Sequence, residues 1–430
     1  MKRRSFLKTN LSAGIGAVAA STIPAFASIS GQNATAPVRV GIVGSGNRAR
    51  GLMRTLLSIP NVLIPAVCDI NPAAIKAAQD IVTKKGQAKP DAYTGPEDYK
   101  KLMDRDDLDA VIIGSPWDLH TPMSVYAMKA GITVGCEVPI AYTLEECWEL
   151  IKTHEETGTP CMMLENWSFR PDNLAVLKMI RQGALGTITH GHCAYSHNCI
   201  NHWYFDSKTG NDRWGAKYLL EHNRAQYPTH QQGPMLSWMN IGCGDYYESI
   251  TSTATGCFSI NEYFQRHFPN HPNGKRKYAQ GDIVTTVVKT KMGKSIVINY
   301  DMQSPRPYDN RWEIQGTRGI YNEQRNAISM EGKSRGSQKW EPFPPHQKKN
   351  QHRWASSASG GHGGADGLMI NQFIKAIREK KPLPLSLYDG VLMSSIGPLS
   401  EASIAGGNQV VKVPDFTQGK WKTNQPYFAI

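Results

Sequence analysis

The stretch from Val38 to Asp69 constrains the fold more than any other part of the chain. A short apolar run rich in β-branched residues, Val38–Val43, predicts a strand. A Gly-rich turn, Gly44–Ala49, follows it, and the next apolar residues are spaced as on one face of a helix. A second apolar run, 62–68, closes on Asp69. The pattern predicts a strand, a turn, a helix and a second strand, with an acid at the tip of the second strand.

The turn reads G-x-G-x-x-A, a variant of the fingerprint that binds the pyrophosphate of a dinucleotide. Gly44 permits a sharp turn, Gly46 lets the backbone approach the phosphates, and Ala49 lets the helix pack close to the sheet. Asp69 would accept hydrogen bonds from the adenosine ribose hydroxyls and repel a 2′-phosphate. The stretch therefore predicts a chain that binds NAD in preference to NADP.

Strands and helices continue to alternate as far as Asn166. Further strands are expected at 109–114, 132–136 and 161–164, with helical spacing between them. Such alternation predicts a Rossmann fold, a doubly wound parallel sheet that binds its ligand at the carboxyl ends of the strands. We expect this N-terminal NAD-binding domain to span residues 37–166. The candidate ligand-binding residues that follow its strands are Trp117, Asp118, Leu119, His120, Glu137, Val138 and Asn166.

The pattern changes after residue 166. After one helix, strands are expected at 188–195, 282–289, 295–301, 312–315 and 319–322, and Gly- or Asn-bearing turns join most of them. Residues 167–430 are therefore expected to form a C-terminal α+β domain with a large open, mostly antiparallel sheet, so the chain as a whole is of the α/β class. Two late helices, 365–380 and 388–403, are expected to return to the first domain. A long irregular stretch, 196–227, has a length that suggests a functional role.

The N-terminus predicts export. Residues 3–8 read R-R-S-F-L-K, a twin-arginine pattern, and a weakly apolar segment leads to the small-residue site Ala25-Phe26-Ala27. We expect a signal peptide over 1–27, a linker over 28–36, and export of the folded chain by the twin-arginine machinery to the periplasm or the medium. A leader that is removed leaves no stable membrane anchor.

Charge and cysteine content indicate neither nucleic-acid binding nor a metal site. The formal net charge is +12, but basic clusters such as Lys275–Lys277 lie in Gly- and Pro-rich stretches without interleaved aromatic residues. This is typical of solvated loops, and no nucleic-acid partner is expected. None of the eight cysteines forms a C-x-x-C pair, so we expect them to be reduced and structural and expect no metal site.

A Rossmann unit whose strands end in S-P-W-D-L-H and E-V-P, followed by an open-faced α/β domain, resembles the Gfo/Idh/MocA oxidoreductase superfamily. The resemblance covers nearly all of residues 38–405. Typical dehydrogenases of that group carry E-K-P, whose lysine helps to move the hydroxyl proton, whereas this chain has Val138 at that position. A valine can neither donate nor accept a proton, which argues against sugar dehydrogenation by that route.

Two further motifs narrow the resemblance. Tyr227-Pro228-Thr229-His230 and Ser304–Tyr308, taken with the leader, are similar to glycoside hydrolase family 109, the NAD-dependent α-N-acetylgalactosaminidases. The family's Y-P-T-H is intact, whereas Gln231–Pro234 departs from its usual G-L-G-P. The resemblance implies NAD as cofactor and a glycan or glycoconjugate substrate. Dimers through the sheet face are common in the superfamily, so a homo-oligomer is a further expectation.

The same resemblance assigns the site residues. Beside Gly44 and Gly46, it implies that NAD is contacted by Asn47, Arg48, Asp69, Trp117, Asp118, Leu119, His120, Glu137, Val138 and Asn166. It implies that the sugar site is lined by Tyr195, Arg213, Tyr227, Pro228, Thr229, His230 and Tyr308. Arg224 is an alternative to Arg213, because the stretch before Tyr227 varies in length.

The family chemistry explains the absence of a conventional carboxylate pair from this assignment. As the resemblance implies, the sugar is oxidised at C3, loses its C2 proton, eliminates the C1 substituent, adds water and is reduced again. Our hypothesis is that His230 and Tyr227 carry this proton traffic, with Tyr195 and Tyr308 as further candidates. Because Pro228 lies between them, no regular helix is expected at Tyr227–His230, and both side chains can project into one cleft. Which residue is base and which is acid stays open. The alternatives are an exported NAD-dependent sugar oxidoreductase and a non-catalytic sugar- or nucleotide-binding protein.

Overall fold

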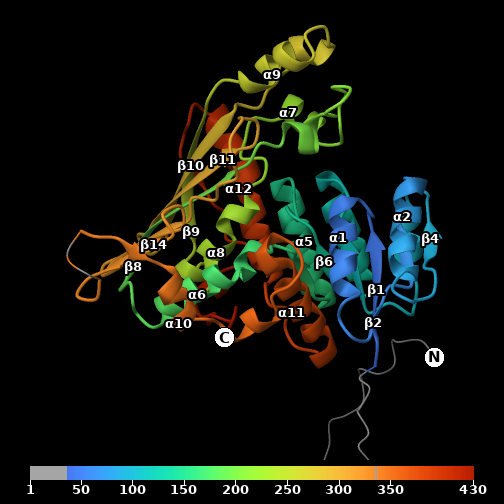
Figure 1. The fold of residues 1–430 in the computed structure, drawn as a ribbon, viewed down its shortest axis with the longest axis horizontal. Helices are drawn as coiled ribbons and strands as arrows, with labels where there is room; N and C mark the ends of the chain where they lie inside the picture. The colour runs from blue at the N-terminus through green and yellow to red at the C-terminus, as the bar shows by residue number, and fades with distance from the viewer. Residues whose placement is uncertain (1–35, 335, 337) are drawn as a thin grey trace, which may run out of the picture. The chain divides into compact units, whose positions relative to one another are not determined.

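The structure is a computed structural model, and it describes residues 36–334, 336 and 338–430. The predicted signal peptide, 1–27, and all but the last residue of the predicted linker, 28–36, lie outside the described residues. Residues 37–430 pack together as a single unit that contains two sheets (Figure 1). The domain boundary expected after residue 166 stays a prediction.

The first sheet is parallel, as predicted. Its strands are β1 (Val38–Val43), β2 (Val62–Leu63), β3 (Ala66–Cys68), β4 (Asp91–Tyr93), β5 (Ala110–Ile113), β6 (Thr133–Cys136) and β7 (Cys161–Met163). Their order is β4-β3-β1-β5-β6-β7, with β2 also paired to β1. Strand order reverses at β1, and this reversal is where a doubly wound sheet binds its ligand. The expected fold class is confirmed.

Helices connect these strands and end where their sequence dictates. They are α1 (Asn47–Leu56), α2 (Pro72–Thr83), α3 (Asp98–Met103), α4 (His120–Lys129) and α5 (Leu144–Thr157). A reciprocal capping box joins Thr143 and Glu146 at the start of α5, and the left-handed Gly158 ends it. One expectation was wrong in detail: the run 62–68 is two short strands, because Pro65 between them has no N–H for the ladder.

The second sheet has nine strands in the order β15-β14-β13-β12-β8-β11-β10-β9-β16. Their bounds are β8 (Ile188–Ser196), β9 (Tyr247–Ala254), β10 (Ile283–Thr290), β11 (Ser295–Asp301), β12 (Glu313–Gly316), β13 (Gly319–Asn322), β14 (Ala327–Met330), β15 (Glu341–Pro342) and β16 (Val411–Lys412). The pair β8–β11 is parallel and the other pairs are antiparallel, which confirms the mostly antiparallel sheet. The sequence did not predict β9, β14, β15 or β16.

Two expectations about the segment before the Y-P-T-H motif and the motif itself were wrong. The stretch 196–227 is not wholly irregular, since it contains a π-helix, Ile200–Tyr204, and the helix α7 (Ala216–Glu221). A regular helix was not expected at Tyr227–His230, yet α8 (Thr229–Met239) begins immediately after Pro228. Pro228 is compatible with this start because a proline N-terminal to a helix removes no hydrogen bond from it.

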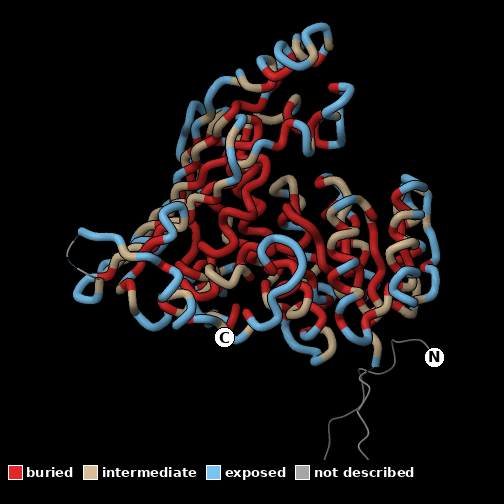
Figure 2. Tube along the Cα trace, viewed as in Figure 1, coloured by how far each residue is buried: buried red, intermediate tan, exposed pale blue. Residues whose placement is uncertain are grey.

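The late helices pack against the first sheet unit, as expected. Helix α11 (Ala365–Glu379) contacts α1 and β1, and α12 (Leu387–Ala405) contacts α5, β7 and β9. Helix α12 is buried along most of its length, and Figure 2 shows it within the buried interior. The remaining helices are α6 (Pro171–Arg181), α9 (Ser259–His267) and α10 (Pro344–Lys349). Among the described residues, none of the helices is long and apolar enough to span a membrane.

Candidate active site

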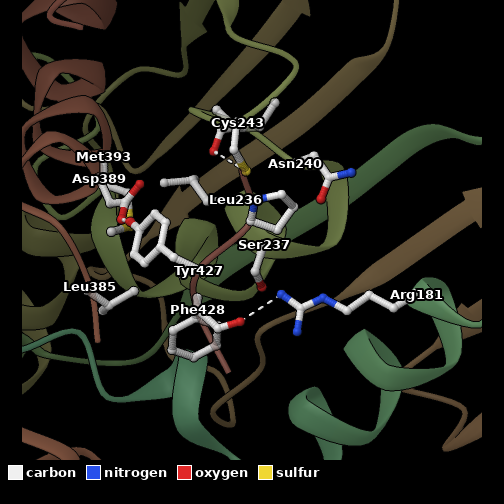
Figure 3. A pocket seen from close by; sticks show the side chains of 13 residues that line it. Arg181, Leu236, Ser237, Asn240, Cys243, Leu385, Asp389, Met393, Tyr427 and Phe428 are labelled. Carbon is white, nitrogen blue, oxygen red and sulfur yellow. Dashed lines mark hydrogen bonds between the residues drawn. The ribbon is translucent and has the colours of Figure 1, made fainter. Parts of the chain in front are cut away.

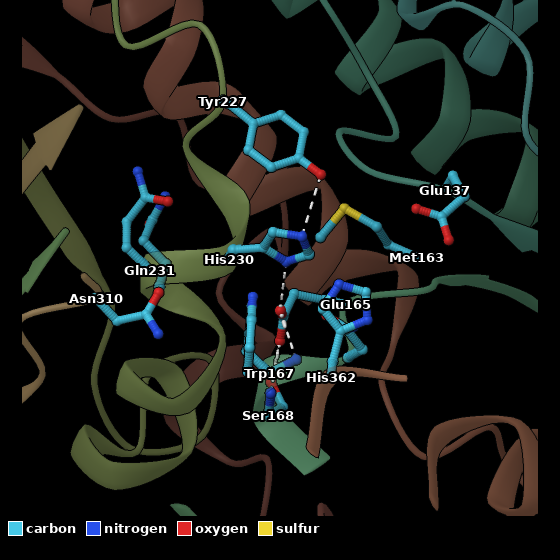
Figure 4. A network of polar contacts seen from close by, with 12 residues as sticks. Glu137, Met163, Glu165, Trp167, Ser168, Tyr227, His230, Gln231, Asn310 and His362 are labelled. Atoms are coloured by element: carbon cyan, nitrogen blue, oxygen red, sulfur yellow. Dashed lines mark hydrogen bonds and ion pairs between the residues drawn. The ribbon is translucent and has the colours of Figure 1, made fainter. Parts of the chain in front are cut away.

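Three buried side chains from two separate parts of the chain form a hydrogen-bonded line (Figure 4). The Tyr227 hydroxyl lies 3.1 Å from His230 Nε2, and His230 Nδ1 lies 2.9 Å from Glu165 Oε1. Glu165 follows β7, whereas His230 is in the first turn of α8. The fold therefore brings the end of the first sheet against the Y-P-T-H motif. The sequence predicted the tyrosine and the histidine but assigned no role to Glu165.

The predicted sugar-site tyrosines gather around this line. The ring of Tyr195 lies 5.0 Å from the Tyr227 ring, 5.4 Å from the His230 ring and 5.7 Å from the Tyr308 ring. Burial raises the pKa of Tyr195 and of Tyr227 well above the ordinary phenol value, and it also raises the pKa of Tyr308. These phenols stay protonated at neutral pH.

Tryptophan side chains connect this tyrosine group to the first sheet. Trp117, which follows β5, stacks on Tyr227 at 5.6 Å and on Tyr218 at 4.7 Å. Trp203 from the π-helix meets the Tyr227 ring edge-on at 4.8 Å. Its place was not predicted, because nothing in the sequence shows that the stretch 196–227 folds back over Trp117.

A second polar cluster lies at the carboxyl ends of the first sheet. Arg48 Nε donates to Glu137 at 2.7 Å, and Arg48 Nη1 donates to Asp366 at 2.8 Å. Asp366 also accepts from Asn166 Nδ2 and contacts His362 Nδ1, each at 2.8 Å. The sequence predicted Arg48, Glu137 and Asn166 as cofactor residues, and the structure brings them together. It did not predict Asp366 or His362, which come from the start of α11 and the turn before it.

The charges in this cluster stabilise one another. Burial alone would lower the pKa of Arg48, but Glu137 and Asp366 outweigh it and raise that pKa above its ordinary value. Burial would raise the pKa of Asp366, but the hydrogen bond from His362 and the charge of Arg48 hold it far below its usual range. Arg48 and Asp366 therefore form a charged pair at neutral pH.

The residues present fit a dinucleotide. Gly44 has φ +78°, and a Cβ there would lie 2.6 Å from the carbonyl carbon of Gly114, so the turn requires glycine. A Cβ on Gly46 would meet nothing within 4 Å, which leaves open space beside the start of α1. Two buried polar atoms, Arg48 Nη2 and Asn166 Oδ1, have no partner within the described chain and are available to a ligand.

The acid expected to bind ribose is held at the tip of β3. Asp69 Oδ2 accepts from the Ser45 amide at 2.7 Å and from its hydroxyl at 3.2 Å, and Asp69 Oδ1 accepts from the Asn71 amide at 2.8 Å. These bonds tie the carboxylate to the Gly-rich turn, where the adenosine ribose would lie.

Other predicted residues are occupied by protein partners. Both ring nitrogens of His120 contact backbone carbonyls, that of Pro139 at 2.7 Å and that of Ser115 at 2.8 Å. Asp118 accepts from Lys217 Nζ and from the Tyr218 hydroxyl, each at 2.7 Å. Contacts of these two residues, of Asn47, of the exposed Leu119 and of the buried Val138 with the cofactor stay predictions.

The two candidate arginines differ sharply. Arg224 is buried with its guanidinium 3.6 Å from the centre of the Tyr142 ring, and it pairs with Glu401 at 3.5 Å. Arg213 is exposed, and its guanidinium donates to the Asn201 carbonyl at 3.4 Å. Arg213 is therefore the more available of the two for a substrate, and its role stays a prediction.

A separate cavity contains none of the predicted site residues (Figure 3). The far end of α8 and the C-terminal segment line it, and Arg181 donates to the carbonyls of Phe428 and Ala429. Burial raises the pKa of Asp389 in its wall to about 6. These contacts dock the C-terminus, and Tyr227, His230 and Glu165 do not line the cavity.

The described part of the chain contains no candidate metal site and no disulfide bond. Within it, no group of three or more His, Cys, Asp or Glu side chains could hold a metal ion. All eight cysteines are free thiols, and six are buried. Burial raises the pKa of Cys136 well above the ordinary thiol value, which keeps it protonated and unreactive.

Family models match both parts of the chain. The model described as glycosyl hydrolase 109, C-terminal domain, matches residues 169–423. The model described as oxidoreductase family, NAD-binding Rossmann fold, matches residues 38–165. The predicted NAD cofactor is confirmed by the second match.

Individual proteins resemble the chain along its whole length. A glycosyl hydrolase family 109 protein from Stenotrophomonas maltophilia is 37% identical, over 100% of this chain and 98% of the relative. An alpha-N-acetylgalactosaminidase from Tannerella forsythia is 36% identical, over 100% of this chain and 99% of the relative. The crystal structure of an oxidoreductase domain protein from Kribbella flavida superposes with a TM-score of 0.69 at 17% identity, covering 88% of this chain and 100% of that one, which shows a shared fold.

Proposed function

Because the chain belongs to glycosyl hydrolase family 109 and is a glycosidase with an NAD-binding Rossmann fold, we propose that it hydrolyses terminal α-N-acetylgalactosaminides in an NAD-dependent reaction. The α-N-acetylgalactosaminidase among its relatives supports the choice of sugar. Tight retention of the cofactor would suit a reaction in which NAD is regenerated in each turnover.

The proposed reaction begins and ends with the same cofactor. Bound NAD supplies a reversible hydride acceptor. The sugar would be oxidised at C3, lose the acidified proton at C2, eliminate its C1 substituent, add water and be reduced again at C3. This sequence needs groups that move protons, and it does not need two carboxylates across the anomeric carbon.

One observation supports this reading most strongly: the Tyr227–His230 pair lies within electrostatic reach of the cofactor cluster. After burial, the charges that act most on the pKa of Tyr227 are those of Glu137, which raises it, and Arg48, which lowers it. This supports the proposal that the groups that move protons and the groups that bind the cofactor belong to one site. Val138, at the position of the dehydrogenase lysine, is buried and apolar and offers no proton there.

An assay separates the proposed function from its alternatives. Purified protein is incubated with p-nitrophenyl α-N-acetylgalactosaminide, without added electron acceptor, and both phenol and NADH are followed. Phenol release without net NADH supports the proposal. NADH formed in step with substrate would instead indicate a sugar oxidoreductase, and neither signal would indicate a binding protein.

The leader is part of the proposal. The R-R-S-F-L-K pattern supports export of the folded chain by the twin-arginine route, with the cofactor acquired before export. Replacing Arg3 and Arg4 by lysine should leave the protein in the cytoplasm of its host, as fractionation would show. Export that is unaffected by the double variant would contradict the proposed route.

A further inference from the structure

We propose that Glu165 is a positioning residue: it holds the proton of His230 on Nδ1, so that Nε2 is the nitrogen that receives a proton during the reaction. The inference rests on the proposed function, which needs a proton-accepting group beside the cofactor. It adds a residue to which the sequence gives no role, and it orders the flow of protons between His230 and Tyr227.

The hydrogen bonds of Glu165 are complete. Its Oε1 accepts from the Trp167 amide at 2.9 Å and faces His230 Nδ1 at 2.9 Å. Its Oε2 accepts from the Ser168 amide at 2.8 Å and from the Ser168 hydroxyl at 2.6 Å. The residue has no solvent exposure. An ionised carboxylate has about four acceptor sites and no donor, so this arrangement uses all of them and leaves the shared proton on the imidazole.

Helix α8 packs directly against the Glu165 carboxylate. A Cβ on Gly233 would lie 1.9 Å from Glu165 Oε2, so only glycine allows the helix to approach this closely. Glycine inside a helix costs about 1 kcal/mol relative to alanine, and the chain bears that cost one turn after His230. The close approach fixes the Glu165–His230 contact, because His230 lies in α8 and Glu165 lies immediately after β7.

The tautomer follows from this arrangement. With the proton on Nδ1, Nε2 carries a lone pair, and the Tyr227 hydroxyl 3.1 Å away donates to it. When Tyr227 takes a proton from the sugar, its own hydroxyl proton passes to Nε2, and the imidazolium that forms lies beside the Glu165 carboxylate. The reverse transfer returns the proton, so no proton is lost or gained over the cycle.

Glu165→Gln tests the inference with little change in shape. Two donors, the amide and hydroxyl of Ser168, face Oε2, whereas only one, the Trp167 amide, faces Oε1 beside His230. We therefore expect the glutamine to keep its carbonyl oxygen at the Oε2 position and to turn its NH₂ group toward His230. Nδ1 must then accept, and the proton moves to Nε2, where Tyr227 can no longer donate. We expect kcat to fall by about 10²-fold or more, with little change in KM and in bound NAD.

The tautomer can be observed independently of activity. Histidine labelled with ¹⁵N distinguishes a protonated from an unprotonated ring nitrogen, and His230→Gln assigns the signals. Spectra recorded over a series of pH values identify the neutral ring and its tautomer. Wild type should show the proton on Nδ1, and Glu165→Gln should show it on Nε2. A proton on Nε2 in wild type, or an unchanged tautomer and kcat in the variant, would overturn the inference.

Two further variants keep the inference testable if Glu165→Gln does not fold. Ser168→Ala removes one hydrogen bond to Oε2 and should lower kcat several-fold while the Nδ1 tautomer is kept. Asp282→Asn is the matched control. Asp282 is another buried carboxylate, which accepts backbone amides from the start of α9, and its replacement should leave kcat unchanged. If wild type releases no phenol, the proposed function fails, but the NMR measurement still decides the role of Glu165.

Discussion

Arg48 in α1 donates to Asp366 in α11 at 2.8 Å, although 318 residues separate them in the chain. The same guanidinium binds Glu137 after β6, and Asp366 also binds Asn166 after β7. One ion cluster thus ties the C-terminal helices to the strand ends of the Rossmann sheet. The expected return of the late helices therefore completes the polar cluster that we propose binds the cofactor.

Asp366→Asn should destabilise the protein in a pH-dependent way. The folded-state pKa of Asp366 lies well below its unfolded value of about 3.9, so its stabilising effect is full above that value and is lost as pH falls toward the folded-state pKa. We expect the variant to be about 1–3 kcal/mol less stable than wild type at pH 7, and the difference to shrink between about pH 5 and pH 3. Urea unfolding of the variant and of wild type at pH 7, pH 5 and pH 3 measures the difference in stability. A constant difference across that range would contradict the ion cluster.

His230→Ala and Tyr227→Phe should each lower kcat for the nitrophenyl substrate by about 10²–10⁴-fold, because each removes one end of the proton path. The nucleotide released from the denatured variants should match that from wild type, since neither side chain belongs to the Arg48 cluster. Either variant with near-wild-type turnover would show that protons move by another path.

Much of the fold could be predicted because its signals are local. Most strands of the first sheet are short, buried apolar runs. The break at Pro65 and the edge strand β4, which is short and largely exposed, were not predicted. The missed strand β9 reads Y-E-S-I-T-S-T-A, which is too polar to stand out. Its pairing with β10 and β16 and its contact with α12 make it a strand, and these partners lie far away in the sequence.

The site was predicted where a motif marks it. Tyr227, His230 and Tyr308 belong to such motifs, and the structure brings them together. Glu165 resembles any solvated acid at a strand end, and its role depends on the approach of α8. No local sequence motif marks Asp366 and His362 either, because Asp366 meets Arg48 and Asn166 only when α11 packs against the first sheet.

Gly233→Ala should destabilise the protein, although alanine normally stabilises a helix. Its Cβ would collide with the fixed carboxylate of Glu165, and such overpacking costs about 1–3 kcal/mol. Gly51→Ala in α1 is a matched control, since its Cβ would meet nothing within 4 Å and should stabilise by up to about 1 kcal/mol. Thermal unfolding of both variants measures the contrast, and equal shifts would mean that Gly233 has room.

Asp69→Asn should weaken NAD binding and reduce the preference over NADP. The variant loses the charge that Ser45 and Asn71 hold in place at the tip of β3. Loss of a hydrogen bond to a charged acceptor is worth about 1.5–3 kcal/mol, so Kd for NAD should rise about 10- to 100-fold while that for NADP changes less. Calorimetric titration of nucleotide-free protein with each cofactor tests this. An unchanged ratio of the two Kd values would assign the discrimination to another residue.

Hydrolysis of the nitrophenyl α-N-acetylgalactosaminide in D₂O tests the central claim most directly. Because the proposed reaction removes the C2 proton and later replaces it from solvent-exchangeable groups, the released sugar should carry one deuterium on C2, detected by mass spectrometry and proton NMR. A sugar released at full rate with only protium on C2 would contradict the oxidation–elimination path and point to direct displacement at C1.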